Sequence, residues 1–432
     1  MSESSPNQLG TIQLLAAFES GRLRPRDVVQ ACLERIFERN AEVNAFTSFD
    51  SRQALSAAEG LGTFDSHRPL YGLPFAVKDV IDTSTYPTSY GSPIYVGHMP
   101  HRDASCVALA REHGGVLLGK VATCEFATQT PSNTRNPLDT RRTPGGSSSG
   151  SAAAVADFMA PFAFGTQTTG STIRPAVYCG IVGTKPSYGF INNAGLKPLS
   201  PEQDTITLFT REVEDAACVL YGLHGARHRP LPAIIPHIGV LRSSQWEHAR
   251  PETVEAIEKM LSRMAKAGAT VTEMRMPAEL EAMVEIQGRI SAYEARHSLV
   301  HERLLHHDQL SSRLQGRLAQ EQETSPDEYF SFKQRARAAR RLAAEWFQQV
   351  DVLLYPAAEG EAELGLMETG SPRYGALWTL LHLPCVSQPI AVGPSGMPLG
   401  AQFIGAYGDD FRVLAAARFM SEQAGYARDM QP

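Results

Sequence analysis

Apolar positions recur at helical spacing near the start of the chain. Pro25 stands where the first turn of a helix tolerates proline. The apolar residues that would then share one helical face are Val28, Val29, Cys32, Leu33 and Ile36. We therefore expect a helix that begins near residue 25 and buries this face in the core.

Short apolar runs then alternate with helical segments. The range 73–81 is rich in strand-forming residues, 104–113 has a helical pattern, 116–120 is again strand-like, and a further apolar run covers 162–165. Strand-like runs return at 350–355, 385–392 and 399–404. This alternation predicts βαβ units and an α/β fold, with a mixed, largely parallel central sheet covered by helices on both faces.

The composition changes after about residue 225. Pro230, Pro232 and Pro236 form a linker-like stretch, and the ranges 251–267 and 291–348 are rich in Glu, Arg, Ala and Leu. Because strand-like runs return afterwards, we interpret the range of about 245–348 as a helix-rich excursion. The prediction is a single domain over residues 1–432.

The net charge and the composition of the first ten residues bear on the partners and the location of the protein. The formal net charge is −6 and no run of Lys or Arg marks a phosphate-binding stripe, so we expect neither nucleic acid nor an anionic membrane as a partner. The first ten residues lack the cationic start and apolar core of a secretory signal, and no apolar stretch approaches the ~20 residues of a spanning helix. We expect a cytoplasmic protein.

The cysteines do not form a recognisable site. The chain has six, with no CxxC pair, which argues against a zinc site and a disulfide framework. Their apolar neighbours predict reduced, buried thiols.

Two segments rich in Gly, Ser and Thr bracket an Ala-rich helix. The first, 143–151, includes Gly145-Gly-Ser-Ser-Ser-Gly150, and it lacks the Gly-Lys-Ser/Thr ending of a phosphate-binding loop. The second, 165–176, packs small residues around Ser171, so backbone N–H groups could converge there. Such converging amides are what an acyl-transfer site needs to hold an oxyanion.

A nucleophilic serine needs a base within hydrogen-bond reach. His98, His101 and His113 do not stand in a nucleophile-elbow context, and no Gly-x-Ser-x-Gly pattern frames Ser171. Lys78 lies in the apolar run 75–80, where burial would lower its pKa toward the neutral, proton-accepting form.

These segments together resemble the amidase signature family, which carries a Ser–cis-Ser–Lys triad on two Gly/Ser blocks. The bridging serine of that family precedes the nucleophile by 24 residues, which selects Ser147, rather than Ser148 or Ser149, as the partner of Ser171. Lys78 matches the family lysine in Gly72-Leu-Pro-Phe-Ala-Val-Lys-Asp79. The likeness also includes the blocks 134–137, 179–186, 204–205 and 396–405.

The resemblance implies an amide hydrolase. Ser171 would be acylated, Ser147 would relay its proton to neutral Lys78, and the cycle would need neither a metal nor an organic cofactor. The expected oxyanion donors are the backbone N–H groups of Thr168, Thr169, Gly170 and Ser171. Thr169 replaces the usual glycine, which puts the backbone angles of this loop in question because threonine disfavours positive φ.

Within the family the sequence is most similar to the malonamidase branch, through the blocks 91–95, 173–176, 369–374 and 377–380. In that branch an arginine at the position of Arg174 pairs with a carboxylate of the substrate, which suits its forked donors. A salt bridge that holds the loop is the alternative role for Arg174.

Other functions remain open. Carbamates, aryl amides and hydrazides are alternative substrates. The alternative classes include a catalytically inactive binding protein and an amidotransferase A-type subunit. The sequence leaves the oligomeric state undecided, and a homodimer is compatible with it.

Overall fold

A single mixed sheet organises the molecule. The computed structural model describes residues 5–320 and 324–424. Its 11-stranded sheet has the order β1-β3-β2-β4-β6-β5-β10-β11-β9-β7-β8. The strands are β1 Phe46–Phe49, β2 Pro74–Lys78, β3 Val116–Val121, β4 Phe162–Gln167, β5 Val182–Lys185, β6 Thr205–Thr210, β7 His237–Arg242, β8 Thr270–Arg275, β9 Val352–Pro356, β10 Cys385–Val392 and β11 Pro398–Ile404.

The predicted βαβ unit is present at one flank of this sheet. Strand β2, helix α4 (Ser105–Glu112) and strand β3 follow one another, and β2 pairs in parallel with both β3 and β4. The other parallel pairs join β7 to β8 and to β9. The centre is antiparallel instead, partly because short connections such as the turn between β10 and β11 can only reverse the chain.

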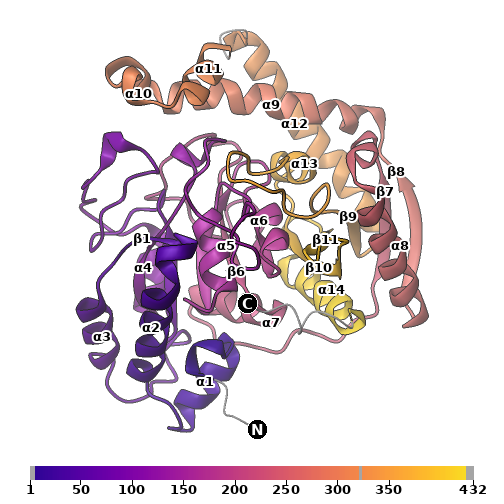
Figure 1. Ribbon diagram of the computed structural model, residues 1–432. Coiled ribbons are helices and arrows are strands. Elements are labelled where there is room, and N and C mark those ends of the chain that lie inside the picture. The colour runs from indigo at the N-terminus through magenta and orange to yellow at the C-terminus, as the bar shows by residue number, and fades with distance from the viewer. Residues whose placement is uncertain (1–4, 321–323, 425–432) are drawn as a thin grey trace.

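Helices cover both faces, as the patterning predicted (Figure 1). On β10, Ser387 donates to a carbonyl of α6 while its neighbour Gln388 donates to a carbonyl of α14, so these two helices lie on opposite faces. The helices are α1 Thr11–Glu19, α2 Pro25–Val43, α3 Ser51–Glu59, α4 Ser105–Glu112, α5 Ser149–Ala156, α6 Ile173–Tyr178, α7 Val213–Leu223, α8 Pro251–Lys266, α9 Ala278–Ser298, α10 Val300–Leu305, α11 Ser312–Gln320, α12 Pro326–Ala344, α13 Arg373–Leu380 and α14 Asp410–Gln423.

Several local predictions are confirmed by burial. Helix α2 begins at Pro25 and buries the expected apolar face, although it runs further, to Val43. All six cysteines are free and buried. The range of about 245–348 is mostly helical, but it also contains β8, an edge strand with mostly exposed side chains. Strand β8 has too few apolar residues for the hydrophobic pattern of the sequence to predict it.

The topology brings the two Gly/Ser segments to one edge of the sheet. Lys78 ends β2, and the segment 168–172 follows its parallel neighbour β4, so both leave the sheet at the same edge. Helix α5 begins at Ser149, directly after the first segment, and packs on β2, β3 and β4. The helices α9, α10 and α11 lie at the top of the view in Figure 1, above α5 and α6.

Candidate active site

Lys78 is fully buried at the end of β2 and contacts two hydroxyl groups. Its Nζ lies 2.8 Å from Ser147 Oγ and 2.7 Å from Thr166 Oγ1. Burial lowers the pKa of Lys78 to about 7, because the charged ammonium loses its hydration. A lysine with this pKa can accept a proton near neutral pH.

The three adjacent serines of the first segment have different partners. Ser147 is the one beside Lys78, whereas Ser148 donates to the carbonyl of Thr166 and Ser149 bonds to Ser132 at 2.7 Å. The peptide bond between Gly146 and Ser147 is cis, as the family resemblance implied.

Ser171 lies in the turn between β4 and α6 and is nearly buried. The N–H of Ser148 donates to the Ser171 carbonyl at 3.4 Å, which joins the two Gly/Ser segments. The side chain of Gln167 organises the same turn, because its Oε1 accepts from the N–H groups of Thr172 (2.9 Å) and Ile173 (3.2 Å).

Ser171 lines a small cavity of about 110 Å³ together with Thr168, Thr169 and Arg174. Segments far apart in the chain complete the walls, among them 127–129, Ser291 of α9, Arg317 of α11 and the range 368–372. Thr168 is held in place by a 2.6 Å bond to buried Asp204. Thr169 does not have a positive φ, so the backbone angles of this loop suit threonine.

Arg174 is buried in the wall of this cavity and donates hydrogen bonds to two carbonyl groups. Its Nε donates to Thr369 O and its Nη2 to Gly146 O, each at 2.5 Å. Burial lowers the pKa of Arg174 from its ordinary value. Its Nη1 has no hydrogen-bond partner within residues 5–320 and 324–424. The side chain therefore braces the cis turn and keeps one donor unused.

Sequence patterns did not reveal Thr166 or Thr379 as neighbours of the site. Thr166 is the last but one residue of β4 and contacts Lys78, and Thr379 lies on α13 and bonds to Thr169 and Gln167. Both lie in blocks that the sequence analysis named, 165–176 and 377–380, but their contacts depend on the packing of distant segments.

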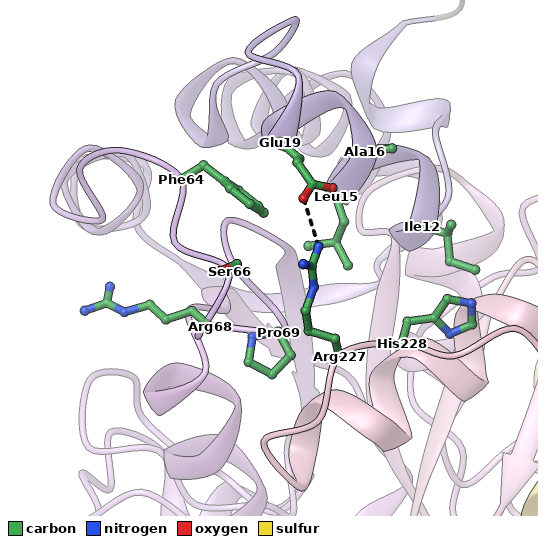
Figure 2. A pocket seen from close by; sticks show the side chains of 10 residues that line it. All are labelled: Ile12, Leu15, Ala16, Glu19, Phe64, Ser66, Arg68, Pro69, Arg227 and His228. Carbon is green, nitrogen blue, oxygen red and sulfur yellow. Dashed lines mark hydrogen bonds and ion pairs between the residues drawn. The ribbon is translucent and has the colours of Figure 1, made fainter.

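Two further cavities lie apart from the predicted site residues. One, of about 180 Å³, is lined by α1 and by the ranges 64–69 and 227–228, where exposed Glu19 and Arg227 pair at 3.0 Å (Figure 2). The other, of about 560 Å³, is lined by Asp79 and Glu125 among others, but both carboxylates accept hydrogen bonds from neighbouring serines. Neither cavity is lined by Lys78, Ser147 or Ser171.

The described residues contain no group of three or more His, Cys, Asp or Glu side chains placed to hold a metal ion. No helix in residues 5–320 and 324–424 combines the length and apolarity needed to cross a membrane.

A family model described as amidase matches residues 27–414. The chain belongs to the amidase signature family. The A-type subunit of the glutamyl-tRNA(Gln) amidotransferase from Oleidesulfovibrio alaskensis is 30% identical in an alignment of 467 positions that covers 95% of this chain and 96% of the relative. This amidase family member is therefore an enzyme that acts on amide C–N bonds.

Solved amidase structures share its fold. One amidase superposes with a TM-score of 0.87 at 29% identity, covering 96% of this chain and all of the other. The peptide amidase of Stenotrophomonas maltophilia gives a TM-score of 0.82 at 25% identity, covering 96% and 97%. These relatives support the enzyme class and do not single out malonamate or any other acyl group.

Proposed function

We propose that this amidase hydrolyses a small amide through an acyl-enzyme on Ser171. The observation that carries the proposal is the 2.8 Å contact between Lys78 Nζ and Ser147 Oγ, in a buried setting that favours the neutral amine. Ser171 itself would be a weak nucleophile without such a base. The first hydrogen-bonded link of a proton relay supports Lys78, Ser147 and Ser171 as the triad.

The proposed reaction combines the Lys78–Ser147 contact with a proton transfer from Ser171 to Ser147. Ser171 Oγ attacks the amide carbonyl as its proton passes to Ser147, whose own proton passes to Lys78. The C–N bond breaks and the leaving amine takes the proton back from Lys78 through Ser147. Water then attacks the ester with the same relay, which releases the acid and frees Ser171.

The turn that carries Ser171 supplies the N–H groups that would stabilise the negative charge of the oxyanion. The N–H groups of Thr169, Gly170 and Ser171 have no acceptor in the part of the chain that the structure describes. With Thr168 they are the proposed oxyanion donors, and losing one such donor typically costs about 3 kcal/mol of barrier.

The substrate is proposed to be a small amide that carries a carboxylate, such as malonamate. The unused Nη1 of Arg174 is a buried cationic donor beside the cavity that Ser171 lines. A carboxylate would satisfy both its charge and its hydrogen bond. The cavity of about 110 Å³ lies well below the roughly 300 Å³ at which pockets for drug-sized ligands begin. Small acyl groups therefore fit best.

Release of the leaving group by the purified chain tests this function: ammonia from primary amides, the amine from substituted amides and carbamates, and hydrazine from the hydrazide. Malonamate, neutral amides, an aryl amide, a carbamate and a hydrazide are supplied separately to the wild type and to Ser171→Ala. We expect Ser171-dependent turnover with malonamate preferred. Turnover of neutral or aryl amides alone would keep the triad and reject the carboxylated substrate, and an unchanged rate in Ser171→Ala would reject the mechanism.

A second candidate is an amidotransferase A-type subunit, which the likeness to the Oleidesulfovibrio alaskensis protein favours. Such a subunit would release ammonia from glutamine for use by partner proteins. Glutamine is therefore included in the assay: efficient hydrolysis of glutamine, with little turnover of small amides, would support this second function.

A further inference from the structure

Helix α13 packs directly against the turn that carries Ser171. Thr379 Oγ1 lies 3.0 Å from the carbonyl oxygen of Thr169 and accepts a hydrogen bond from Gln167 Nε2 at 3.1 Å. Thr379 and Gln167 are both fully buried. A residue 208 positions beyond Ser171 in the chain thus holds a main-chain carbonyl two residues before it.

The contact leaves no room for a side chain on the facing position of the helix. A Cβ at Gly375 would lie 2.5 Å from Thr169 O and 2.9 Å from Gly170 Cα. These are backbone atoms, so the helix and the turn lie in direct contact. The carbonyl of Thr169 is therefore clamped between Gly375 and the Thr379 hydroxyl.

Because they belong to one planar peptide group, fixing the Thr169 carbonyl also fixes the direction of the Gly170 N–H. The bond between Thr169 and Gly170 is trans, since the cis bond within the described residues is the one before Ser147. In a trans peptide the carbonyl oxygen and the following N–H point in opposite directions. With Thr169 O directed at α13, the N–H of Gly170 points away from the helix and remains without an acceptor in the described chain.

We propose that Thr379 is a positioning residue that orients the Gly170 N–H toward the oxyanion of the acyl-transfer reaction, by binding the carbonyl of Thr169. This inference rests on the proposed function. Gln167 extends the same support, because its Oε1 holds the N–H groups of Thr172 and Ile173 while its amide donates to Thr379. One network thus anchors the turn on both sides of Ser171.

The hydroxyl of Thr379 also lies 2.9 Å from Gly375 O, the carbonyl four residues earlier in its own helix. A bond to this carbonyl alone would be local to α13 and would leave the turn untouched. If the hydroxyl binds Thr169 O, its loss should slow the reaction of Ser171. If it binds only Gly375 O, its loss should leave that reaction unchanged.

The test compares Thr379→Val, which removes the hydroxyl and keeps the shape, with Thr379→Ser, which keeps the hydroxyl. Thr379→Ala serves as a second hydroxyl-free variant if Thr379→Val does not fold. Thr253→Val is the matched control, because Thr253 is a buried helical threonine whose hydroxyl donates to the carbonyl of Glu359 outside the site. Thermal unfolding confirms that each variant is folded.

The first readout is the rate at which an alkyl fluorophosphonate labels Ser171. The Oγ–P bond forms as the Ser171 proton passes through Ser147 to Lys78 and the P–F bond breaks to release fluoride. The reaction therefore needs no knowledge of the natural substrate. We expect labelling to slow about 10- to 100-fold in Thr379→Val. This effect should not exceed the roughly 100- to 1000-fold loss of rate that follows removal of a whole oxyanion donor. Thr379→Ser should stay within about threefold of the wild type, and Thr253→Val should match it.

The second readout is steady-state turnover of the best amide found in the substrate panel. A misdirected oxyanion donor should lower kcat and leave KM within about twofold, because the interaction strengthens only in the transition state. Equal rates in Thr379→Val and wild type would overturn the inference, as would an equally slow Thr379→Ser or a KM that rises in step with the loss of kcat. A wild-type protein that is neither labelled at Ser171 nor active on any amide would reject the proposed function as well.

Discussion

Lys78 shows how burial alone changes the chemistry of a residue. A lysine exposed on a strand would stay protonated to about pH 10. Here the side chain is enclosed at the end of β2, and the hydroxyl groups of Ser147 and Thr166 are its hydrogen-bond partners. No carboxylate among the described residues bonds to its Nζ, so little offsets the cost of the charge and its pKa falls to about 7.

The pH dependence of turnover follows from this shift. Because the base must be neutral to accept a proton, activity rises with pH as Lys78 loses its proton. We expect log kcat/KM to climb by about one unit per pH unit below pH 7 and to level off above it. A profile of kcat/KM between pH 5 and pH 9 measures this limb, and a flat profile across pH 5–8 would contradict the role of Lys78.

Arg174 combines support of the turn with a guanidinium nitrogen, Nη1, that has no partner in the described chain and lies beside the cavity. Replacing it with lysine keeps the charge but removes the fork that holds Gly146 O and Thr369 O. Replacing it with methionine removes the charge as well. We expect Arg174→Met to lose about 10- to 100-fold in kcat/KM for a carboxylated amide beyond its loss for a neutral amide, from a charged hydrogen bond of about 1.5–3 kcal/mol.

The neutral amide is the internal control for the Arg174 variants. An equal loss on both substrates would show that Arg174 acts only by bracing the cis turn. Arg174→Lys keeps the positive charge without the forked donors. It should therefore retain part of the preference for the carboxylated amide.

At the scale of elements, small residues let α5 approach the sheet. The helix is Ala-rich and wholly buried, and it starts directly after Ser147 and Ser148. A Cβ at Gly150 would lie 2.2 Å from the N of Ala122 and 2.5 Å from the O of Ala45. The first turn of α5 therefore touches backbone on two sides, and this contact positions Ser147 beside Lys78.

Enlarging Gly150 should disturb both stability and the site. We expect Gly150→Ala to destabilise the protein by about 1–3 kcal/mol, because backbone atoms must move to admit the methyl group. Gly288→Ala on α9 is the matched control: nothing lies within 4 Å of its added Cβ, so better helix propensity should stabilise the protein by up to about 1 kcal/mol. Urea unfolding measures the free energy of unfolding of both variants. An unchanged free energy of unfolding in Gly150→Ala would contradict the close approach of α5 to the sheet.

At the scale of the whole molecule, polar contacts tie the helices α9 to α12 to the sheet body. Glu302 of α10 is fully buried and accepts hydrogen bonds from Lys197 and, at 2.6 Å, from Tyr95. Glu294 of α9 likewise accepts from Ser200. The excursion also contributes Ser291 and Arg317 to the cavity wall, so its attachment matters for the site.

The Glu302 contact should make stability depend on pH. Burial acts to raise the pKa of Glu302, but the bonds from Lys197 and Tyr95 outweigh it and the net pKa is lowered. A lowered folded-state pKa means that the contribution is present above the unfolded value of about 4.3 and is lost as the pH falls through the folded value. Removing the charge in Glu302→Gln should cost about 1.5–3 kcal/mol at pH 7.

Urea unfolding of wild type and Glu302→Gln from pH 3 to pH 7 checks this expectation. The difference between the two should be largest near neutral pH and should shrink toward pH 3. A difference that stays constant with pH would show that folding does not lower the pKa of Glu302.

The sequence by itself determined the α/β class, the run of β2, α4 and β3 and the helix from Pro25, and it predicted Lys78, Ser147 and Ser171 as the triad. These features rest on local periodicity or on motifs in which chain neighbours carry the information. The spacing of Ser147 and Ser171 is itself a property of the chain.

Only the tertiary structure decided which distant groups meet. The antiparallel centre, the edge strand β8, the contact of Thr166 with Lys78 and the contact of Thr379 with Thr169 arise when separate segments pack together. Both threonines lie in blocks that the sequence singled out, but no local pattern says which distant groups they contact. The pKa of Lys78 likewise comes from burial, which is a property of the whole fold and of no short stretch of sequence.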